Sequence, residues 1–486
     1  MSLQSSAARG SAITLASQVI RLLVMLASTV VLARLLSPDD YGLVAMVTAI
    51  VGIADIFRDF GLSMAALQAR DLTQHQKSNL FWINAVVGLV LAVVIFALAY
   101  PIAAFYGEPR IVPMVQVIST VYLVGGLSAQ FRVAINRQLR FFALSLSDII
   151  PLALAFAGAY VLALGGAGVW ALVAQQMIIA VGSFVMVVLL ARWWPSLPRR
   201  GQDMKPLLTF GVSFAATQLI SYLTRNVDSI AIGRVWGPGP LGFYNRAYQL
   251  MVLPLNQINT PLSRVAVPVL SRITDDRSRY LNYLRKAQLV ACYLTASLFL
   301  VIAAIGPEAV QLLLGDGWDL AGDILSILAV GGLFRSIQQI SYWMYMSQGL
   351  AGAQLRFYLF AQPVVIAAML AGLPWGPIGV AVGNAAGYAF FWAASLLWAG
   401  RVSQLDVRPL ITDAIRTILC FGVPGAAAAF AVVNFTDFDN FVKVVLAVLA
   451  ALVWYAIAWL TIRPVRRDLG VLFEFARLAV SRRRDR

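Results

Sequence analysis

Apolar runs of roughly 20 or more residues recur along the chain, separated by short polar connections. Each run is long enough to cross the ~30 Å hydrocarbon core of a bilayer as a helix. The composition agrees, because 60% of the 486 residues are hydrophobic and only 12% are charged, about half the charged fraction of a soluble protein. The sequence therefore predicts an all-α polytopic membrane protein and excludes the soluble, disordered and fibrous classes.

Division of these runs at Pro, Gly and charge clusters predicts fourteen transmembrane helices. Their approximate ranges are 11–34, 40–67, 78–104, 111–136, 142–164, 168–191, 206–234, 240–270, 284–306, 320–346, 354–373, 377–400, 410–433 and 441–462. The second, eighth and tenth of these spans carry the most polar residues. The first run has no small-residue cleavage site, so a cleaved signal peptide is not expected.

The positive charges are unevenly distributed among the connections. If the N-terminus is cytoplasmic, 25 of the 37 Lys and Arg residues fall in cytoplasmic segments, 4 fall in the opposite loops and 8 fall within spans. Cytoplasmic loops of membrane proteins are enriched in Lys and Arg. The sequence therefore predicts that both termini are cytoplasmic. The net charge of +15 is explained by this bias, and nucleic-acid binding is not expected.

The segment after the last span, residues 463–486, carries eight arginines and an apolar stripe that includes Val465 and Leu469 at helical spacing. This pattern favours an amphipathic basic helix on the anionic inner leaflet of the membrane. A solvated basic tail is the alternative.

The chain contains an internal repeat. A gapless shift of 200 residues aligns the first predicted span with the seventh, and places Arg34, Pro38 and Gly42 on Arg234, Pro238 and Gly242. Parallel six-helix repeats occur in transporters that bind their substrate between the halves. We therefore predict an N-terminal six-helix lobe at 1–200, a repeated lobe at 201–405, two additional transmembrane helices at 406–462, and the tail.

Signs of an enzyme are absent from the sequence. His75 is the single histidine, Cys292 and Cys420 lie in apolar runs, and no Walker A loop is present. The external loops are short and hold no positioned pair of catalytic groups. We therefore expect neither an enzyme nor a bound metal or cofactor.

Eight arginines and five acids fall within the predicted spans. A charge at the bilayer centre costs at least about 2.5 kcal/mol, so such residues usually face the bundle interior or water. Five of these thirteen lie near span ends, where long side chains can reach water, and are interpreted as structural. These five are Arg132, Arg264, Arg416, Asp148 and Asp323.

The other charges belong to polar patterns at three- and four-residue spacing, each of which forms a stripe along a helix. The stripes include Gln18 and Arg21 in the first span, Gln218, Tyr222, Arg225 and Asp228 in the seventh, Arg246, Gln249 and Asn256 in the eighth, and Arg335 and Gln338 in the tenth. Asp55, Arg58 and Asp59 can neutralise one another within the second span. Together these stripes predict a wet cavity, with polar contacts between helices as the alternative.

The sign of this cavity is positive. Every basic group within the spans is Arg, whose planar fork of donors suits phosphate and carboxylate. The predicted substrate-binding residues are Arg21, Arg58, Arg225, Arg246 and Arg335, of which Arg225 is the strongest candidate because it lies midway along its span. Asp55, Asp59 and Asp228 are candidates for ion coupling.

Four segments resemble a known family. ARLLSPDDYGLVAM at 33–46, DFGLSMAALQ at 59–68, NVDSIAIGRVWGPGPLGFYNRAYQLMVLP at 226–254 and VPVLSRITDD at 267–276 resemble polysaccharide exporters of the WzxC and succinoglycan-exporter type, in the multidrug/oligosaccharidyl-lipid/polysaccharide flippase superfamily. The resemblance covers roughly residues 10–460. It implies two six-helix lobes plus two helices, and a cationic central cavity to which Arg21 and Arg225 belong.

The same resemblance implies a function. Such a protein would move undecaprenyl-pyrophosphate-linked oligosaccharide across the bacterial cytoplasmic membrane, driven by protons, sodium or the membrane potential, and would work beside a polysaccharide polymerase and glycosyltransferases. The first span lacks the acidic residue that drug exporters of this superfamily use, which leaves the coupling ion open. The alternatives are a small-molecule antiporter of the same superfamily and a membrane glycosyltransferase or ligase.

Overall fold

The computed structural model describes residues 3–59, 63, 73–198, 222 and 225–470, and within this part of the chain every regular element is a helix. The chain forms two compact units, Met1–Gly242 and Phe243–Arg486. The four segments that the sequence predicts stay predictions.

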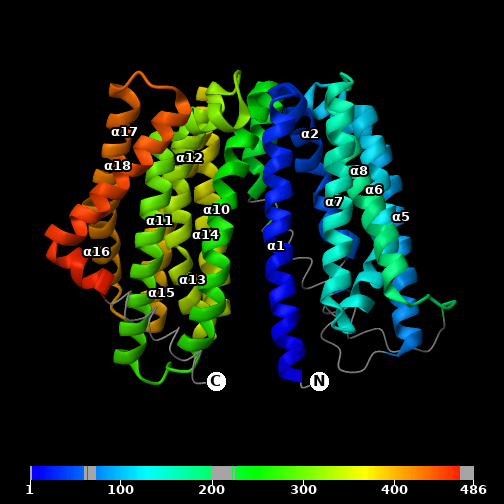
Figure 1. Cartoon of the computed structure of the whole chain (residues 1–486). Coiled ribbons are helices and arrows are strands. Elements are labelled where there is room, and N and C mark those ends of the chain that lie inside the picture. The colour runs from blue at the N-terminus through cyan, green and yellow to red at the C-terminus, as the bar shows by residue number, and fades with distance from the viewer. Residues whose placement is uncertain (1–2, 60–62, 64–72, 199–221, 223–224, 471–486) are drawn as a thin grey trace. The chain divides into compact units, whose positions relative to one another are not determined.

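The first unit consists of long helices packed side by side (Figure 1). They are α1 (Leu3–Ala33), α2 (Pro38–Val51), α3 (Ile53–Asp59), α5 (Gln74–Tyr106), α6 (Ile111–Arg137), α7 (Phe141–Leu164) and α8 (Val169–Ala191). Residues 225–236 are also helical. Most of the predicted seventh span, 206–234, lies outside the described residues.

The second unit continues with helices that follow the remaining predicted spans. They are α10 (Pro238–Ser271), which begins in the first unit, α11 (Arg277–Leu314), α12 (Asp319–Ile337), α13 (Gln339–Ser347), α14 (Ala351–Ala371), α15 (Gly376–Ser403), α16 (Arg408–Thr417), α17 (Val423–Phe435) and α18 (Asn440–Thr461). A short 3₁₀ turn, η1 (Leu373–Trp375), joins α14 to α15, and a π-helical turn, η2 (Ile418–Gly422), joins α16 to α17.

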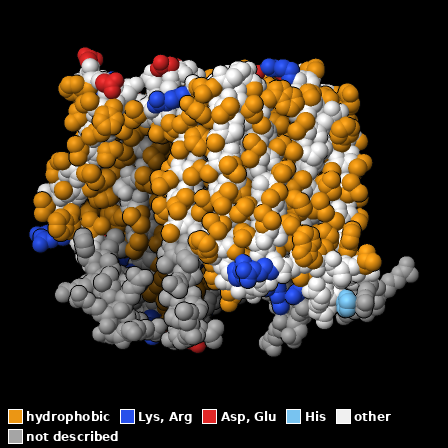
Figure 2. All heavy atoms as spheres, turned by 45° about the vertical axis from the view of Figure 1, so that its right-hand side comes forward, with side chains coloured by type: hydrophobic (Ala, Val, Ile, Leu, Met, Phe, Trp, Pro, Cys, Tyr) orange, Lys and Arg blue, Asp and Glu red, His pale blue; other side chains and the backbone are white. Residues whose placement is uncertain are grey.

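Ten helical stretches of the described residues are long and apolar enough to cross a membrane. In the helices that come forward in Figure 2, hydrophobic side chains cover the long middle region, and charged side chains gather near the helix ends. This distribution is that of a lipid-exposed bundle. The structure thus confirms a polytopic all-helical membrane protein, and the count of fourteen spans stays a prediction.

The second predicted span, 40–67, is interrupted at Gly52, between α2 and α3. The sequence determines where α2 begins, because Ser37 and Asp40 form a capping box and Pro38 occupies the first position of the helix. At the interruption, the hydroxyl of Tyr222 donates to the carbonyl oxygens of Thr48 at 2.8 Å and Ala49 at 3.2 Å. Such tertiary hydrogen bonds to the backbone stabilise an interruption that a sequence pattern alone does not reveal.

The residues aligned by the 200-residue shift contact one another inside the first unit. A Cβ added to Gly42 would collide with the carbonyl of Pro238, and a Cβ added to Gly242 would collide with the carbonyl of Pro38. Equivalent positions of the repeat therefore make reciprocal contacts in which glycine allows two backbones to approach closely.

We expect Gly42→Ala to lower the thermal stability of the purified protein by the equivalent of about 1–3 kcal/mol, the usual effect of overpacking. Gly239→Ala is the matched control, since nothing lies within 4 Å of a Cβ at this position. The melting temperature of each variant in detergent is measured by size-exclusion chromatography after heating. Equal melting temperatures for the two variants would show that the backbones at Gly42 and Pro238 can move apart without a loss of stability.

At its beginning the C-terminal tail packs against the second unit, and the membrane-surface helix predicted for the whole of 463–486 stays a prediction. Residues 463–470 are helical, but Val465 is only 1% exposed and packs with Leu289, Tyr293 and Phe421 of the second unit. Asp468 is also buried and pairs with Arg416. The apolar side chains of these residues therefore face protein and not the bilayer surface, and the buried Asp468 is neutralised by the partly exposed Arg416. Residues 471–486 lie outside the described part of the chain.

Candidate functional site

A polar cavity of about 670 Å³ lies among α3, α6 and α8 of the first unit. Its lining consists of Asp55, Arg58, Ser63, Val121, Gly125, Ser128, Ala129, Arg132, Val133, Asn136, Gln176, Ile179, Ala180 and Ser183. Two guanidinium groups, one carboxylate and several hydroxyl and amide groups thus face one space between membrane helices. This is the size and composition of a site for a polar ligand.

Arg58 and Arg132 have different charge environments. Arg58 forms an ion pair with Asp55 one turn earlier, with 3.0 Å between nitrogen and oxygen, so this pair is locally neutral. Arg132 pairs with Asp148 of α7, and the other carboxylate oxygen of Asp148 accepts a hydrogen bond from Arg21 of α1 at 3.2 Å. A single carboxylate therefore serves two arginines.

This sharing leaves one positive charge in excess in the Arg21–Asp148–Arg132 group. The side chains of Arg21 and Arg132 are 54% and 43% exposed, whereas that of Asp148 is 19% exposed. The donors are therefore more accessible than the acceptor. An excess guanidinium charge among membrane helices favours an anionic ligand, and phosphate can accept two of its hydrogen bonds at once.

Helix geometry explains how these side chains meet. Ser128, Arg132 and Asn136 follow one another at intervals of four residues, so they form a polar stripe on one face of α6. Gly125 lies one turn before Ser128, and a Cβ there would stand 3.0 Å from a terminal nitrogen of Arg58. Glycine at 125 leaves room for that guanidinium against α6.

The second unit has its own row of polar contacts, between α10 and the α12–α13 segment. Asn259 accepts a hydrogen bond from Ser336 at 2.7 Å. Ser263 accepts hydrogen bonds from Gln339 at 3.0 Å and from Trp343 at 2.8 Å. These contacts join helices, which is the alternative interpretation of the polar stripes.

Arg335 lies in an aromatic environment on the same segment. Its guanidinium donates to the hydroxyl of Tyr248 at 2.7 Å and lies 5.2 Å from the ring centre of Tyr388. Such contacts stabilise a cation and fix its orientation. The two contacts therefore fix the direction in which the guanidinium of Arg335 points.

The other predicted site residues have the following places. Gln249 accepts from Arg246 at 2.8 Å and donates to Asn245 at 3.0 Å. Gln338 donates to Tyr358 at 3.4 Å. Gln18, Arg225 and Asn256 are exposed, and Asp228 is buried. Gln218 and the side chain of Asp59 lie outside the described residues.

The structure therefore brings Asp55 and Arg58 together at one cavity and connects Arg21 to it through Asp148. It places Arg246 and Arg335 in the other unit. Sequence reasoning assigned Arg132 a structural role and missed Ser128, Asn136, Gln176 and Ser183. The four-residue spacing of Ser128, Arg132 and Asn136 was the available signal. Within the described residues, no group of three His, Cys, Asp or Glu side chains could hold a metal ion.

Comparisons with known proteins agree with this description. A family model described as "Polysaccharide biosynthesis protein" matches residues 31–323. Lipopolysaccharide biosynthesis protein WzxC of Escherichia coli K12 is 26% identical over 394 residues, which cover 79% of this chain and 78% of that protein. Teichuronic acid biosynthesis protein TuaB of Bacillus subtilis 168 is 28% identical over 311 residues, 63% of each protein.

Among solved structures, lipid II flippase MurJ in an inward closed conformation is similar with a TM-score of 0.71. The match covers 93% of this chain and 98% of that protein at 16% sequence identity. At this identity the likeness establishes the fold alone.

The fold and the arginine-bearing cavity define a multi-pass membrane protein with a site for a polar ligand. The chain belongs to the polysaccharide biosynthesis protein family, since the family model covers more than half of its length. The predicted family is confirmed, and the names of the two relatives refer to the biosynthesis of lipopolysaccharide and of teichuronic acid.

Proposed function

We propose that this protein moves a polyprenyl-pyrophosphate-linked oligosaccharide, with undecaprenyl as the lipid, from the inner to the outer leaflet of the bacterial cytoplasmic membrane. The excess positive charge of the Arg21–Asp148–Arg132 group at the polar cavity carries this proposal. A pyrophosphate would compete with Asp148 for these donors and would form charge-assisted hydrogen bonds. The hydroxyl and amide groups of the cavity would replace part of the hydration of the sugars.

The named relatives support an acidic or lipid-linked surface glycan as the final product, since their names refer to lipopolysaccharide and teichuronic acid. In a pathway of this kind, glycosyltransferases would build the substrate of the transporter and a polysaccharide polymerase would use its product. Transport would follow alternating access, driven by protons, sodium or the membrane potential, with Asp55, Asp59 and Asp228 as candidates for coupling. A cationic cavity disfavours an antiporter for cationic drugs.

The experiment is depletion of the protein in its native host, followed by analysis of lipid-linked sugars and surface polysaccharide. We expect a pyrophosphate-linked oligosaccharide to accumulate in the inner leaflet while surface polysaccharide decreases. Re-expression of the wild-type chain should reverse both changes. Unchanged surface polysaccharide with no accumulated lipid would contradict the proposal.

The distribution of Lys and Arg supports a cytoplasmic position for both termini. Single cysteines introduced at positions 108 and 437 should then react with an impermeant thiol reagent added to intact spheroplasts, and cysteines at 77 and 277 should not. Labelling of all four positions, or the reverse pattern, would contradict this orientation.

A further inference from the structure

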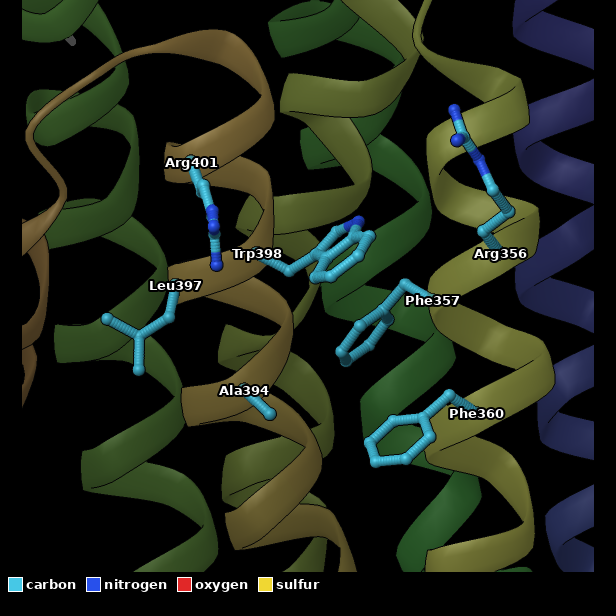
Figure 3. A pocket seen from close by; sticks show the side chains of 7 residues that line it. All are labelled: Arg356, Phe357, Phe360, Ala394, Leu397, Trp398 and Arg401. Atoms are coloured by element: carbon cyan, nitrogen blue, oxygen red, sulfur yellow. The ribbon is translucent and has the colours of Figure 1, made fainter.

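A second cavity, of about 530 Å³, lies between α14 and α15 in the second unit. Figure 3 shows its lining, which consists of Arg356, Phe357, Phe360, Ala394, Leu397, Trp398 and Arg401. Apart from the two arginines, every side chain in this lining is apolar. We call this space the α14–α15 groove.

The groove opens onto the lipid-facing surface of the helices. Phe360 is 68% exposed and Leu397 is 53% exposed, although both are large hydrophobic residues on helices of a membrane protein. Phe357 is buried behind them and packs on Trp398, with 6.3 Å between the ring centres. The packed aromatic side chains therefore form a wall of the groove that faces the hydrocarbon region of the membrane.

The two arginines lie at the same end of the groove, one on each helix (Figure 3). This follows from the hairpin: Arg356 lies near the start of α14, Arg401 lies near the end of α15, and the short η1 turn joins the opposite ends. Among the described residues, no carboxylate lies within 4.0 Å of either guanidinium. The contact of Arg356 with a protein acceptor is a 3.4 Å hydrogen bond to the carbonyl of Gly352, on its own helix.

The spacing along the helices matches a lipid. Arg356 is five residues from the start of α14, or about 7.5 Å at the rise of an α-helix. Phe360 lies about 6 Å deeper than Arg356, and Ala394 lies about 10 Å from Arg401 toward the η1 turn. The charged end is thus at the depth of lipid headgroups, and the apolar part extends toward the middle of the bilayer.

We propose that the α14–α15 groove is a binding site for an anionic phospholipid, with its phosphate between Arg356 and Arg401 and an acyl chain against Phe357, Phe360 and Trp398. Charge complementarity supports an anion, because these two guanidinium groups have no acidic partner in the part of the chain that the structure describes and stand at the border of a low-dielectric region. The apolar lining supports a lipid tail. A lipid-linked sugar fits less well, because this lining offers no hydroxyl or amide group to a glycan.

This site is separate from the polar cavity of the proposed function, and shares no residue with it. Its occupant would be a component of the surrounding membrane. The lipid would neutralise the two arginines and hold α14 and α15 together at their open end. We therefore expect anionic lipid to raise the thermal stability of the protein.

The test is native mass spectrometry of the purified full-length protein titrated with palmitoyl-oleoyl phosphatidylglycerol. Phosphatidylcholine with the same acyl chains is the comparison lipid. We expect saturable binding of phosphatidylglycerol, weakened about tenfold or more in the double variant Arg356→Gln/Arg401→Gln, since each charge-assisted hydrogen bond contributes roughly a factor of ten or more. The double variant Arg272→Gln/Arg279→Gln, which removes the same charge from exposed positions outside the groove, should bind as the wild type does.

A second variant fills the groove and leaves its charge unchanged. Ala394→Trp should also weaken phosphatidylglycerol binding, because the larger side chain occupies the place of the acyl chain. Equal binding by wild type and by both groove variants would overturn the proposal, as would equal binding of the two lipids. Displacement of phosphatidylglycerol by an equimolar amount of undecaprenyl pyrophosphate would instead identify the groove as a site for the transported lipid.

Discussion

Arg132→Ala is expected to reduce polysaccharide export about a hundredfold or more while the protein remains in the membrane. The substitution removes a guanidinium from the cavity and leaves Asp148 paired with Arg21 alone, so the local excess of positive charge disappears. Loss of two charge-assisted hydrogen bonds to a phosphate costs about 3 kcal/mol or more, which corresponds to roughly a hundredfold change. Surface polysaccharide per cell, measured at equal membrane levels of the protein, is the readout.

Two further variants separate substrate binding from a structural role. Arg132→Lys should restore export only in part, because an ammonium group keeps the charge and loses the bidentate fork. Arg137→Ala removes an arginine from the last turn of the same helix, outside the cavity lining, and should export normally. If Arg132→Ala exports normally at normal expression, Arg132 is a structural partner of Asp148, and Arg225 and Arg335 become the best remaining candidates.

The cavity also shows where sequence reasoning succeeded. The apolar runs predicted the helices because a membrane span imposes its length on the sequence. The expectation of intramembrane arginines around a polar space was derived from the same constraint, since a charge within lipid requires a partner or water. The sequence indicated an ion pair between Arg58 and Asp55 at i−3, and the structure has this pair in the lining of the cavity, while their role in substrate binding stays a prediction.

Arg132 was assigned differently because a sequence gives the distance of a residue from a helix end, but not the direction of its side chain. Arg132 lies five positions before Arg137, the last residue of α6, which is compatible with a side chain that reaches water. The partner that determines its direction, Asp148, belongs to another helix and was itself interpreted as an end residue. Tertiary pairing of this kind leaves no periodic pattern in the chain.

The break between α2 and α3 was missed for the same reason. Tyr222, whose hydroxyl donates to the carbonyls of Thr48 and Ala49, is more than 170 residues away in sequence. The role of Arg416 was also hidden in the sequence, because its partner Asp468 lies 52 residues later in a segment with the pattern of a basic tail. Long-range hydrogen bonds and ion pairs thus account for the main differences between expectation and structure.

Asp413→Ala is expected to lower the stability of the second unit substantially. The side chain of Asp413 is 2% exposed, and its Oδ2 and Oδ1 accept hydrogen bonds from Nε and a terminal nitrogen of Arg285. Arg416 lies 3.2 Å from the same Oδ1. Removal of one partner of a buried ion pair leaves an uncompensated charge and usually costs 3–5 kcal/mol. Because both guanidinium groups keep partial access to water, we expect about 3 kcal/mol.

The control for this prediction is Asp275→Ala, which removes an exposed acid from the turn before α11 and should change stability by less than about 0.5 kcal/mol. Thermal unfolding in one detergent compares the variants. The double variant Arg285→Ala/Asp413→Ala should lose less than the sum of the two single losses, because it leaves no unpaired charge between α11 and α16. Strict additivity would mean that the two side chains act independently, and the ion pair could then not be what fixes α16 against α11.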